Sequence, residues 1–237
     1  MSASAQERAA TILVFDVNET LLDIGALAPQ FMKVFGRADV LQEWFSTVVL
    51  YSQVTTIAGP YVDFGTVARG ALDMTAAGHG VSLQPADRDG IMKGLVTLPA
   101  HPDVRPALDK LRAAGFRMVT LTNSAPAAVE QQLTNAGINS YFEKRISVDS
   151  VRRFKPASEV YRLAASELGV EPPQLRLIAA HAWDVMGAMR AGYRAAFVAR
   201  PGKVLYPVAD KPDIVAATMT AVADQIIRID RPVFPAK

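Results

Sequence analysis

Cysteine is absent from this chain of 237 residues. Its absence excludes a disulfide framework, a thiolate nucleophile and a cysteine zinc site, and it is typical of a protein of the reducing cytoplasm. An excess of one charge is lacking too, since 25 Lys and Arg face 23 Asp and Glu and the net charge is +2. The sequence has no basic stripe, so it does not predict a nucleic-acid partner.

Long hydrophobic runs are also missing. The sequence contains no stretch of eighteen apolar residues and therefore predicts no membrane span. The first ten residues lack the basic and apolar segments of a signal peptide. We therefore expect a cytoplasmic protein with no membrane or nucleic-acid partner. Half of the residues are nevertheless hydrophobic, which is enough to bury a full core.

Four short apolar segments predict buried parallel strands, because they lack the polar alternation of a half-exposed sheet. They are residues 11–16, 117–123, 175–181 and 194–200. Apolar residues spaced by three and four, closing on glycine, predict crossover helices within 102–116, 124–138 and 156–170. Together they predict an α/β fold with a doubly wound, Rossmann-like parallel sheet.

Residues 23–98 break this rhythm, because they show helical patterns but no apolar strand. The candidate helices lie within 26–36, 40–59 and 61–78. We expect a small helical cap, inserted after the first strand into a core of residues 1–22 and 99–237. Such a cap would overhang the carboxyl ends of the strands, where ligands bind in open α/β sheets. The apolar stripe of the second helix indicates cap core or a dimer face, which leaves a homodimer open.

Polar residues follow the predicted strands, and the carboxyl ends of parallel strands lie along one edge of a sheet. These residues are Asp16, Thr122, Asn123, His181 and Asp184, and Lys155 stands just ahead of a helix start. A hydroxyl, an ammonium and two carboxylates at one edge, under a helical cap, would form a catalytic constellation.

The order of these residues resembles the haloacid dehalogenase superfamily. Its pattern is DxxxT after the first strand, Ser or Thr after the second, Lys before a later helix and an acid after the next strand. Here the matches are Asp16 to Thr20, Thr122, Lys155 and Asp184. "SVDSVRRFKPASEVY" and "HAWDVMGA" are similar to the type II (L-)2-haloacid dehalogenases, which hydrolyse 2-haloalkanoic acids to 2-hydroxy acids. The resemblance covers nearly the whole chain and implies a 2-haloacid substrate, water and no cofactor.

Asn18 distinguishes between two chemistries of the superfamily. Its phosphatases place an acid two residues after the nucleophile to protonate the leaving alkoxide, and they hold magnesium with further acids. This chain has Asn18 at the first position and Ala180 four residues before Asp184. Halide leaves as a stable anion without a proton. We therefore expect metal-independent attack of Asp16 on C2 and an aspartyl ester that water hydrolyses.

Charge and reach indicate the catalytic roles. Lys155 is expected to pair with Asp16, and Asp184 to anchor Lys155 and position water. Thr20 is expected to support the loop of the nucleophile. The expected substrate pocket comprises Val17, Asn18, Phe45, Thr122, Asn123, Tyr161 and Trp183. Its strand-end side chains and the backbone amides after the nucleophile would receive the substrate carboxylate.

Three positions depart from the type II pattern. That pattern implies a halide-binding arginine in the cap where this chain has Phe45, while Arg37 and Arg69 lie elsewhere in the cap. His181 replaces an asparagine, and Ala179 replaces the serine two positions earlier. We predict that Phe45 makes the halide pocket more apolar. We also predict that His181 either donates a hydrogen bond to halide or carboxylate, or accepts a proton from the hydrolytic water.

Two alternatives stay open on the sequence alone. A magnesium-dependent small-molecule phosphatase of the same superfamily would release phosphate and no halide. A non-catalytic relative that binds small carboxylates, which the missing arginine favours, would show neither activity.

Overall fold

The computed structural model describes residues 10–232, so the outer ends of the predicted core, residues 1–9 and 233–237, lie outside the described residues. The strands are β1 (Ala10–Phe15), β2 (Met118–Thr122), β3 (Lys144–Ser147), β4 (Leu175–Ala179), β5 (Arg194–Val198), β6 (Ile214–Ala216) and β7 (Arg231–Pro232). All pairings within this sheet are parallel, in the order β3-β2-β1-β4-β5-β6, and β7 lies beside the start of β1.

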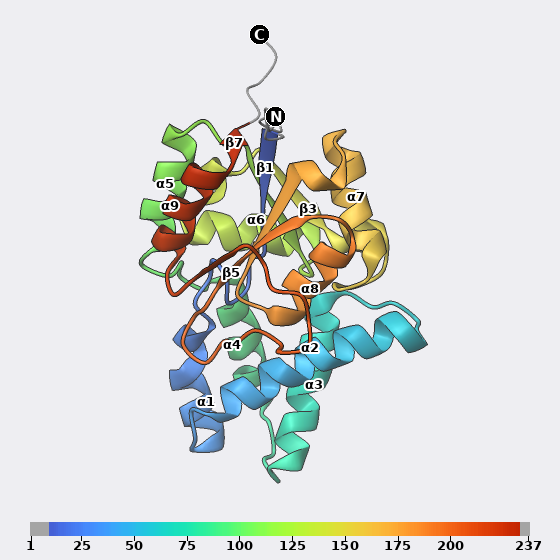
Figure 1. The fold of residues 1–237 in the computed structure, drawn as a ribbon. Helices are drawn as coiled ribbons and strands as arrows, with labels where there is room; N and C mark the ends of the chain where they lie inside the picture. The colour runs from blue at the N-terminus through green and yellow to red at the C-terminus, as the bar shows by residue number, and fades with distance from the viewer. Residues whose placement is uncertain (1–9, 233–237) are drawn as a thin grey trace, which may run out of the picture.

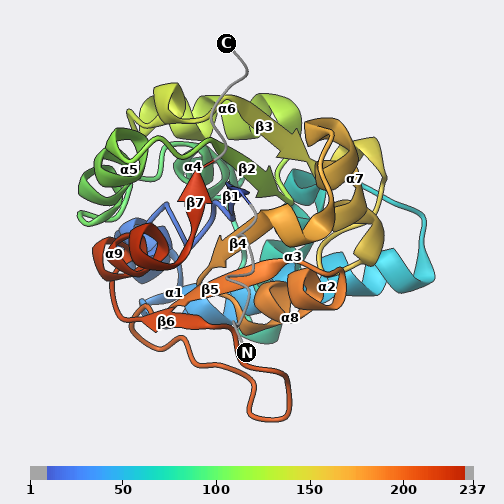
Figure 2. The same ribbon diagram turned by 45° about the horizontal axis from the view of Figure 1, so that its top comes forward.

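Helices cover both faces of the sheet, as Figure 2 shows. One face carries α5 (Val104–Ala113), α6 (Pro126–Asn135) and α9 (Met219–Ile229), and the other carries α7 (Ser158–Leu168) and α8 (Ala182–Arg190). Short 3-10 turns are η2 (Asn139–Tyr141), η3 (Val148–Ser150) and η4 (Pro172–Gln174). The predicted doubly wound α/β fold is confirmed. The short strands β3, β6 and β7 were not predicted.

A group of helices between β1 and α5 lies beyond the carboxyl edge of the sheet (Figure 1). It consists of η1 (Ile24–Leu27), α1 (Ala28–Phe35), α2 (Val40–Ala58), α3 (Phe64–Gly78) and α4 (Pro85–Val96). The fully buried Trp44 of α2 anchors the group, because its indole donates a hydrogen bond to the carbonyl of Ala68 at 3.0 Å. The apolar stripe of α2 faces both inward and outward, since Val48 is buried and Ile57 is 85% exposed.

Helix α4 was not predicted from the sequence. Two glycines interrupt its apolar pattern. A side chain at Gly94 would place its Cβ 2.4 Å from Leu27 Cδ2, so the side chain of Leu27 in η1 would have to move to make room for it. Among the described residues, none of the helices combines the length and the apolar character that crossing a membrane requires.

The register of the central strands aligns the ends that carry the polar residues. Phe15, the last residue of β1, lies opposite Thr120 of β2 and Ile178 of β4. All three strands are buried along their apolar residues. Asp16, the next residue, therefore follows the middle strand of the sheet, between the ends of β2 and β4.

Candidate active site

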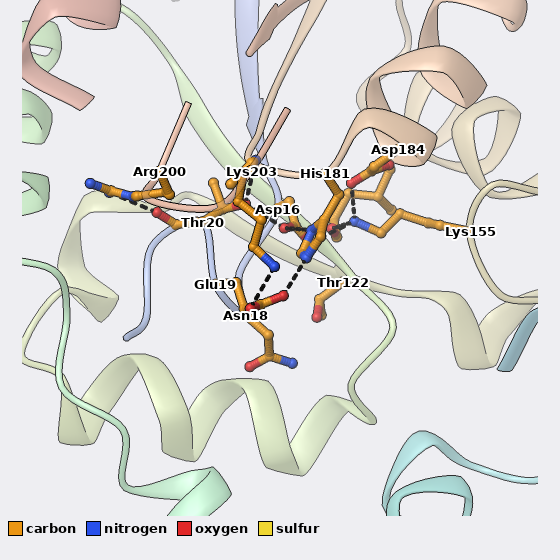
Figure 3. A network of polar contacts seen from close by, with 12 residues as sticks. Asp16, Asn18, Glu19, Thr20, Thr122, Lys155, His181, Asp184, Arg200 and Lys203 are labelled. Carbon is orange, nitrogen blue, oxygen red and sulfur yellow. Dashed lines mark hydrogen bonds and ion pairs between the residues drawn. The ribbon is translucent and has the colours of Figure 1, made fainter. Parts of the chain in front are cut away.

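Three charged side chains meet where β1, α7 and α8 converge (Figure 3). Lys155 Nζ lies 2.8 Å from Oδ1 of Asp16 and 2.6 Å from Oδ2 of Asp184. The ammonium also donates to the carbonyl of Leu121 at 3.0 Å, so its three protons all have acceptors. All three charged residues are buried. The strand ends thus bring together the ammonium and the two carboxylates at hydrogen-bonding distance.

The second oxygen of Asp16 has two neighbours of its own. Thr20 Oγ1 donates to Oδ2 of Asp16 at 2.5 Å and accepts the backbone N–H of Ala180 at 2.9 Å. Nδ1 of His181 lies 3.1 Å from the same Oδ2. Among the described residues, Oδ2 therefore has two hydrogen-bond donors, whereas Oδ1 has one, Lys155.

His181 bridges two carboxylates. Its Nε2 lies 2.8 Å from Oε2 of Glu19, and Oε1 of Glu19 accepts a hydrogen bond from Lys203 Nζ at 2.7 Å. The imidazole also stacks on Trp183, with ring centroids 5.0 Å apart. The contacts form one chain of side chains with alternating charge: Asp184, Lys155, Asp16, His181, Glu19 and Lys203.

The pKa values follow from this alternation. Burial would lower the pKa of His181, but hydrogen bonds and charge attraction from Asp16 and Glu19 raise it to about 9. Burial would raise the pKa of Asp16, yet Lys155 and His181 hold it below its usual range. Burial dominates at Asp184 and raises its pKa. At neutral pH, His181 is therefore an imidazolium that donates from both nitrogens.

Asn18 is engaged by the core rather than left free beside the nucleophile. Its Nδ2 donates to Ser124 Oγ at 3.3 Å, and its Oδ1 accepts from Gln132 Nε2 at 3.0 Å. The neighbouring Val17 is fully buried, and its carbonyl accepts the backbone N–H groups of Leu21 and Leu22. These contacts fix the turn that carries Asp16.

Thr122 and Asn123 lie at the end of β2, as expected. Oδ1 of Asn123 accepts the backbone N–H of Lys155 at 3.0 Å, and Thr122 Oγ1 accepts that of Ser124 at 3.1 Å. Tyr161 donates to Oδ1 of Asp184 at 2.7 Å. Tyr161 thus contacts Asp184 and not the small cavity beside the nucleophile.

That cavity has a volume of about 20 Å³, close to the room that one water molecule needs. It is lined by Asp16, Asn18, Phe45, Val49, Phe64, Thr122, Asn123, His181 and Trp183. Phe45, Val49 and Phe64 come from α2 and α3, Trp183 comes from α8, and the remaining residues lie at or just after the ends of the strands. No arginine is among these lining residues. Arg37 and Arg69 instead form surface ion pairs with Asp39 and Asp89.

The family model for haloacid dehalogenase-like hydrolases matches residues 10–192. The chain belongs to this family. The match includes Asp16, Lys155 and Asp184, and it confirms the resemblance that these residues indicated. In the part of this hydrolase that the structure describes, no group of three or more His, Cys, Asp or Glu side chains is arranged to hold a metal ion.

Several relatives of this hydrolase are named as (S)-2-haloacid dehalogenases. An (S)-2-haloacid dehalogenase of Xanthobacter autotrophicus is 32% identical over 79% of this chain and 74% of its own length. One of Pseudomonas fluorescens is 27% identical over 90% of this chain and 95% of its own. The structure of an L-2-haloacid dehalogenase from X. autotrophicus covers 92% of this chain and 98% of its own, with a TM-score of 0.86 and 27% identity. The same enzyme with chloropropionic acid covalently bound matches with a TM-score of 0.85 and 26% identity.

Glu19 and Lys203 of this hydrolase were not predicted as site residues. Glu19 lies in the turn after Asp16 and has a φ of 61°, in the left-handed region. The turn "DVNETLLD" contains no glycine that would indicate a left-handed residue, so nothing in the sequence pointed to this conformation. Lys203 lies 184 positions further along, so no sequence spacing indicated the contact.

Proposed function

We propose that this hydrolase dehalogenates short 2-haloalkanoic acids to 2-hydroxy acids through an ester on Asp16. The observation that carries the proposal is that Asp16, paired with Lys155, lines a cavity. The same cavity is lined by Asn18, at the position where a phosphatase would have a proton-donating acid. A structural relative at 26% identity holds chloropropionic acid covalently bound, which agrees with an ester intermediate. The proposed reaction takes place in the cytoplasm, in agreement with a chain without cysteine.

Oδ1 of Asp16 is the attacking atom in this proposal. A carboxylate oxygen has two lone pairs in its plane, and Oδ2 already faces Thr20 and His181. Oδ1 has one hydrogen-bond donor among the described residues, Lys155, and keeps a lone pair for C2 of the substrate. The new bond joins Oδ1 to C2 while the bond between C2 and the halogen breaks, and the halide leaves with the electron pair. Attack opposite the halogen inverts C2.

Water then attacks Cγ of Asp16, and the bond between Cγ and Oδ1 breaks. Negative charge develops on Oδ2, where Thr20 and His181 supply donors. Lys155, next to Oδ1, gives a proton to the leaving oxygen of the 2-hydroxy acid. Asp184, 2.6 Å from Lys155, takes one proton of the water and returns it to Lys155. The other proton leaves the restored Asp16 carboxyl group for the solvent.

Of the two roles predicted for His181, the proposal keeps that of hydrogen-bond donor. Its pKa of about 9 leaves it protonated at neutral pH, so it holds a proton where a general base would need a lone pair. Phe45 gives the halide an apolar wall in place of an arginine.

We further infer that residues 23–98 act as a cap that opens for the substrate. A cavity of about 20 Å³ holds a water molecule but not a haloacid. Three of its lining residues, Phe45, Val49 and Phe64, belong to α2 and α3. Separation of these helices from the sheet edge would enlarge it, and closure over the substrate would exclude bulk water from the ester.

The experiment that tests the proposal is an assay of halide release from L-2-chloropropionate and bromoacetate, with and without a chelator. We expect release that the chelator does not change and that is lost in Asp16→Asn. A phosphatase would instead release phosphate from a phosphomonoester only with magnesium, and no halide. Glu43→Gln, a change at an exposed carboxylate of α2, serves as the control and should keep the parental rate.

A further inference from the structure

Glu19 occupies an unusual place for a charged residue. It is 5% exposed and its φ of 61° is one that residues other than glycine rarely adopt. Such a conformation persists only where the surroundings hold it. Here His181 and Lys203 each contact one carboxylate oxygen, at 2.8 Å and 2.7 Å, and Nε2 of His101 lies 3.2 Å from the backbone carbonyl.

The charges of the six side chains from Asp184 to Lys203 balance only if His181 is cationic. The carboxylates are those of Asp16, Asp184 and Glu19, and the cations are those of Lys155, Lys203 and His181. A neutral His181 would leave one buried negative charge without a counterion, which is unfavourable. The nearby Arg200 does not supply it, because its guanidinium pairs with Asp103.

Esterification changes this balance at one position. When Oδ1 of Asp16 becomes the ester oxygen, Asp16 loses its charge, and its attraction for the imidazolium of His181 largely disappears. Glu19 is then the remaining carboxylate in contact with that ring. Oδ2 meanwhile becomes the carbonyl oxygen on which negative charge develops when water attacks Cγ.

We propose that Glu19 is a positioning residue that keeps His181 cationic while Asp16 is esterified, so that Nδ1–H of His181 stabilises the charge developing on Oδ2. The inference rests on the proposed function. During this step the bond from water oxygen to Cγ forms and the bond from Cγ to Oδ1 breaks, while His181 keeps its proton. Lys203 orients Glu19 by holding its other oxygen.

Two variants remove the carboxylate in different ways. Glu19→Gln keeps the size of the side chain but not its charge. Glu19→Gly suits the left-handed backbone, so it should fold even if Glu19→Gln does not. The matched control is Glu43→Gln, because Glu43 contacts the other carboxylate-bound histidine, His79, at 2.8 Å on the surface.

The first readout is an NMR titration of the three histidines in the free protein. We expect His181 to titrate near 9 in the parent and at least about one pKa unit lower in both Glu19 variants. Glu43→Gln should leave His181 unchanged. A His181 pKa that is the same in the parent and in Glu19→Gly would overturn the inference, whether or not the protein dehalogenates.

The second readout separates the two steps, using excess enzyme and bromoacetate. Halide reports ester formation, and glycolate reports ester hydrolysis. In Glu19→Gly we expect hydrolysis to slow by about 10- to 100-fold near pH 8, so that the esterified protein accumulates in a mass spectrum. The loss should shrink near pH 6, where His181 regains its proton. An equal loss at both pH values, or a loss confined to halide release, would overturn the inference. Absence of halide release in the parent would refute the proposed function instead.

Discussion

Replacing Lys155 with methionine tests the electrostatics of the site most severely. The substitution keeps the length of the side chain but removes the ammonium that lies 2.8 Å from Asp16 and 2.6 Å from Asp184. Both carboxylates are buried, and breaking a buried pair by removing one partner costs about 3–5 kcal/mol. His181 still faces Asp16, so Asp184 is the carboxylate left without a cation.

This cost depends on pH in a direction that the structure fixes. Without Lys155, burial raises the pKa of Asp184 further above the unfolded value of about 3.9. A carboxyl whose folded pKa is raised binds its proton more tightly in the folded state, so stability falls as pH rises through that window. The destabilisation therefore reaches its full size at pH values well above the raised pKa of Asp184. It shrinks as pH falls toward the pKa of Asp184 in the unfolded protein.

The assay is urea unfolding of the parent and of Lys155→Met at about pH 5 and at about pH 8. We expect the substitution to lower the free energy of unfolding by at least about 1 kcal/mol more at pH 8 than at pH 5. The control is Lys33→Met, because Lys33 lies 2.7 Å from Asp87 but is 74% exposed. That surface pair should contribute less than about 1 kcal/mol. Equal destabilisation by Lys155→Met at both pH values would refute the reasoning.

Three further predictions concern the cavity and the contacts of Asp16. Phe45→Arg should raise turnover of fluoroacetate relative to bromoacetate, because a guanidinium stabilises the compact fluoride more, and an unchanged ratio would count against a halide wall at this position. Thr20→Val should lower the free energy of unfolding by about 1–3 kcal/mol, since Asp16 and the N–H of Ala180 both lose a partner; a loss near zero in urea titrations would contradict this. His181 stabilises the fold fully below its unfolded pKa of about 6.5. This stabilisation is lost as pH rises through about 9, so the stability difference from His181→Gln should shrink over that window.

The parts of the site that were predicted from the sequence depend on short-range rules. Asp16 and Asp184 follow buried apolar strands and Thr122 ends one, and parallel strands place such residues at one edge. Lys155 precedes a helix start, and its charge and reach predicted its pairing with Asp16. These rules use the order of elements along the chain, which the sequence contains.

The parts that were missed depend on contacts between distant segments. Glu19 reaches His181 because the turn after β1 adopts a positive φ, and no glycine indicated that turn. Lys203 contacts Glu19 across the sheet edge from the loop after β5. The protonation of His181 depends on both neighbouring carboxylates. None of these could be read from residue type and spacing alone.

A single turnover in ¹⁸O-labelled water, with enzyme in excess of L-2-chloropropionate, tests the central claim most directly. If water attacks Cγ of an ester on Asp16, the product takes its new oxygen from Asp16, and the label appears in the peptide that contains Asp16. The lactate from that first turnover should be unlabelled. Labelled lactate together with an unlabelled Asp16 peptide would mean that water attacks C2 directly, and it would contradict the account.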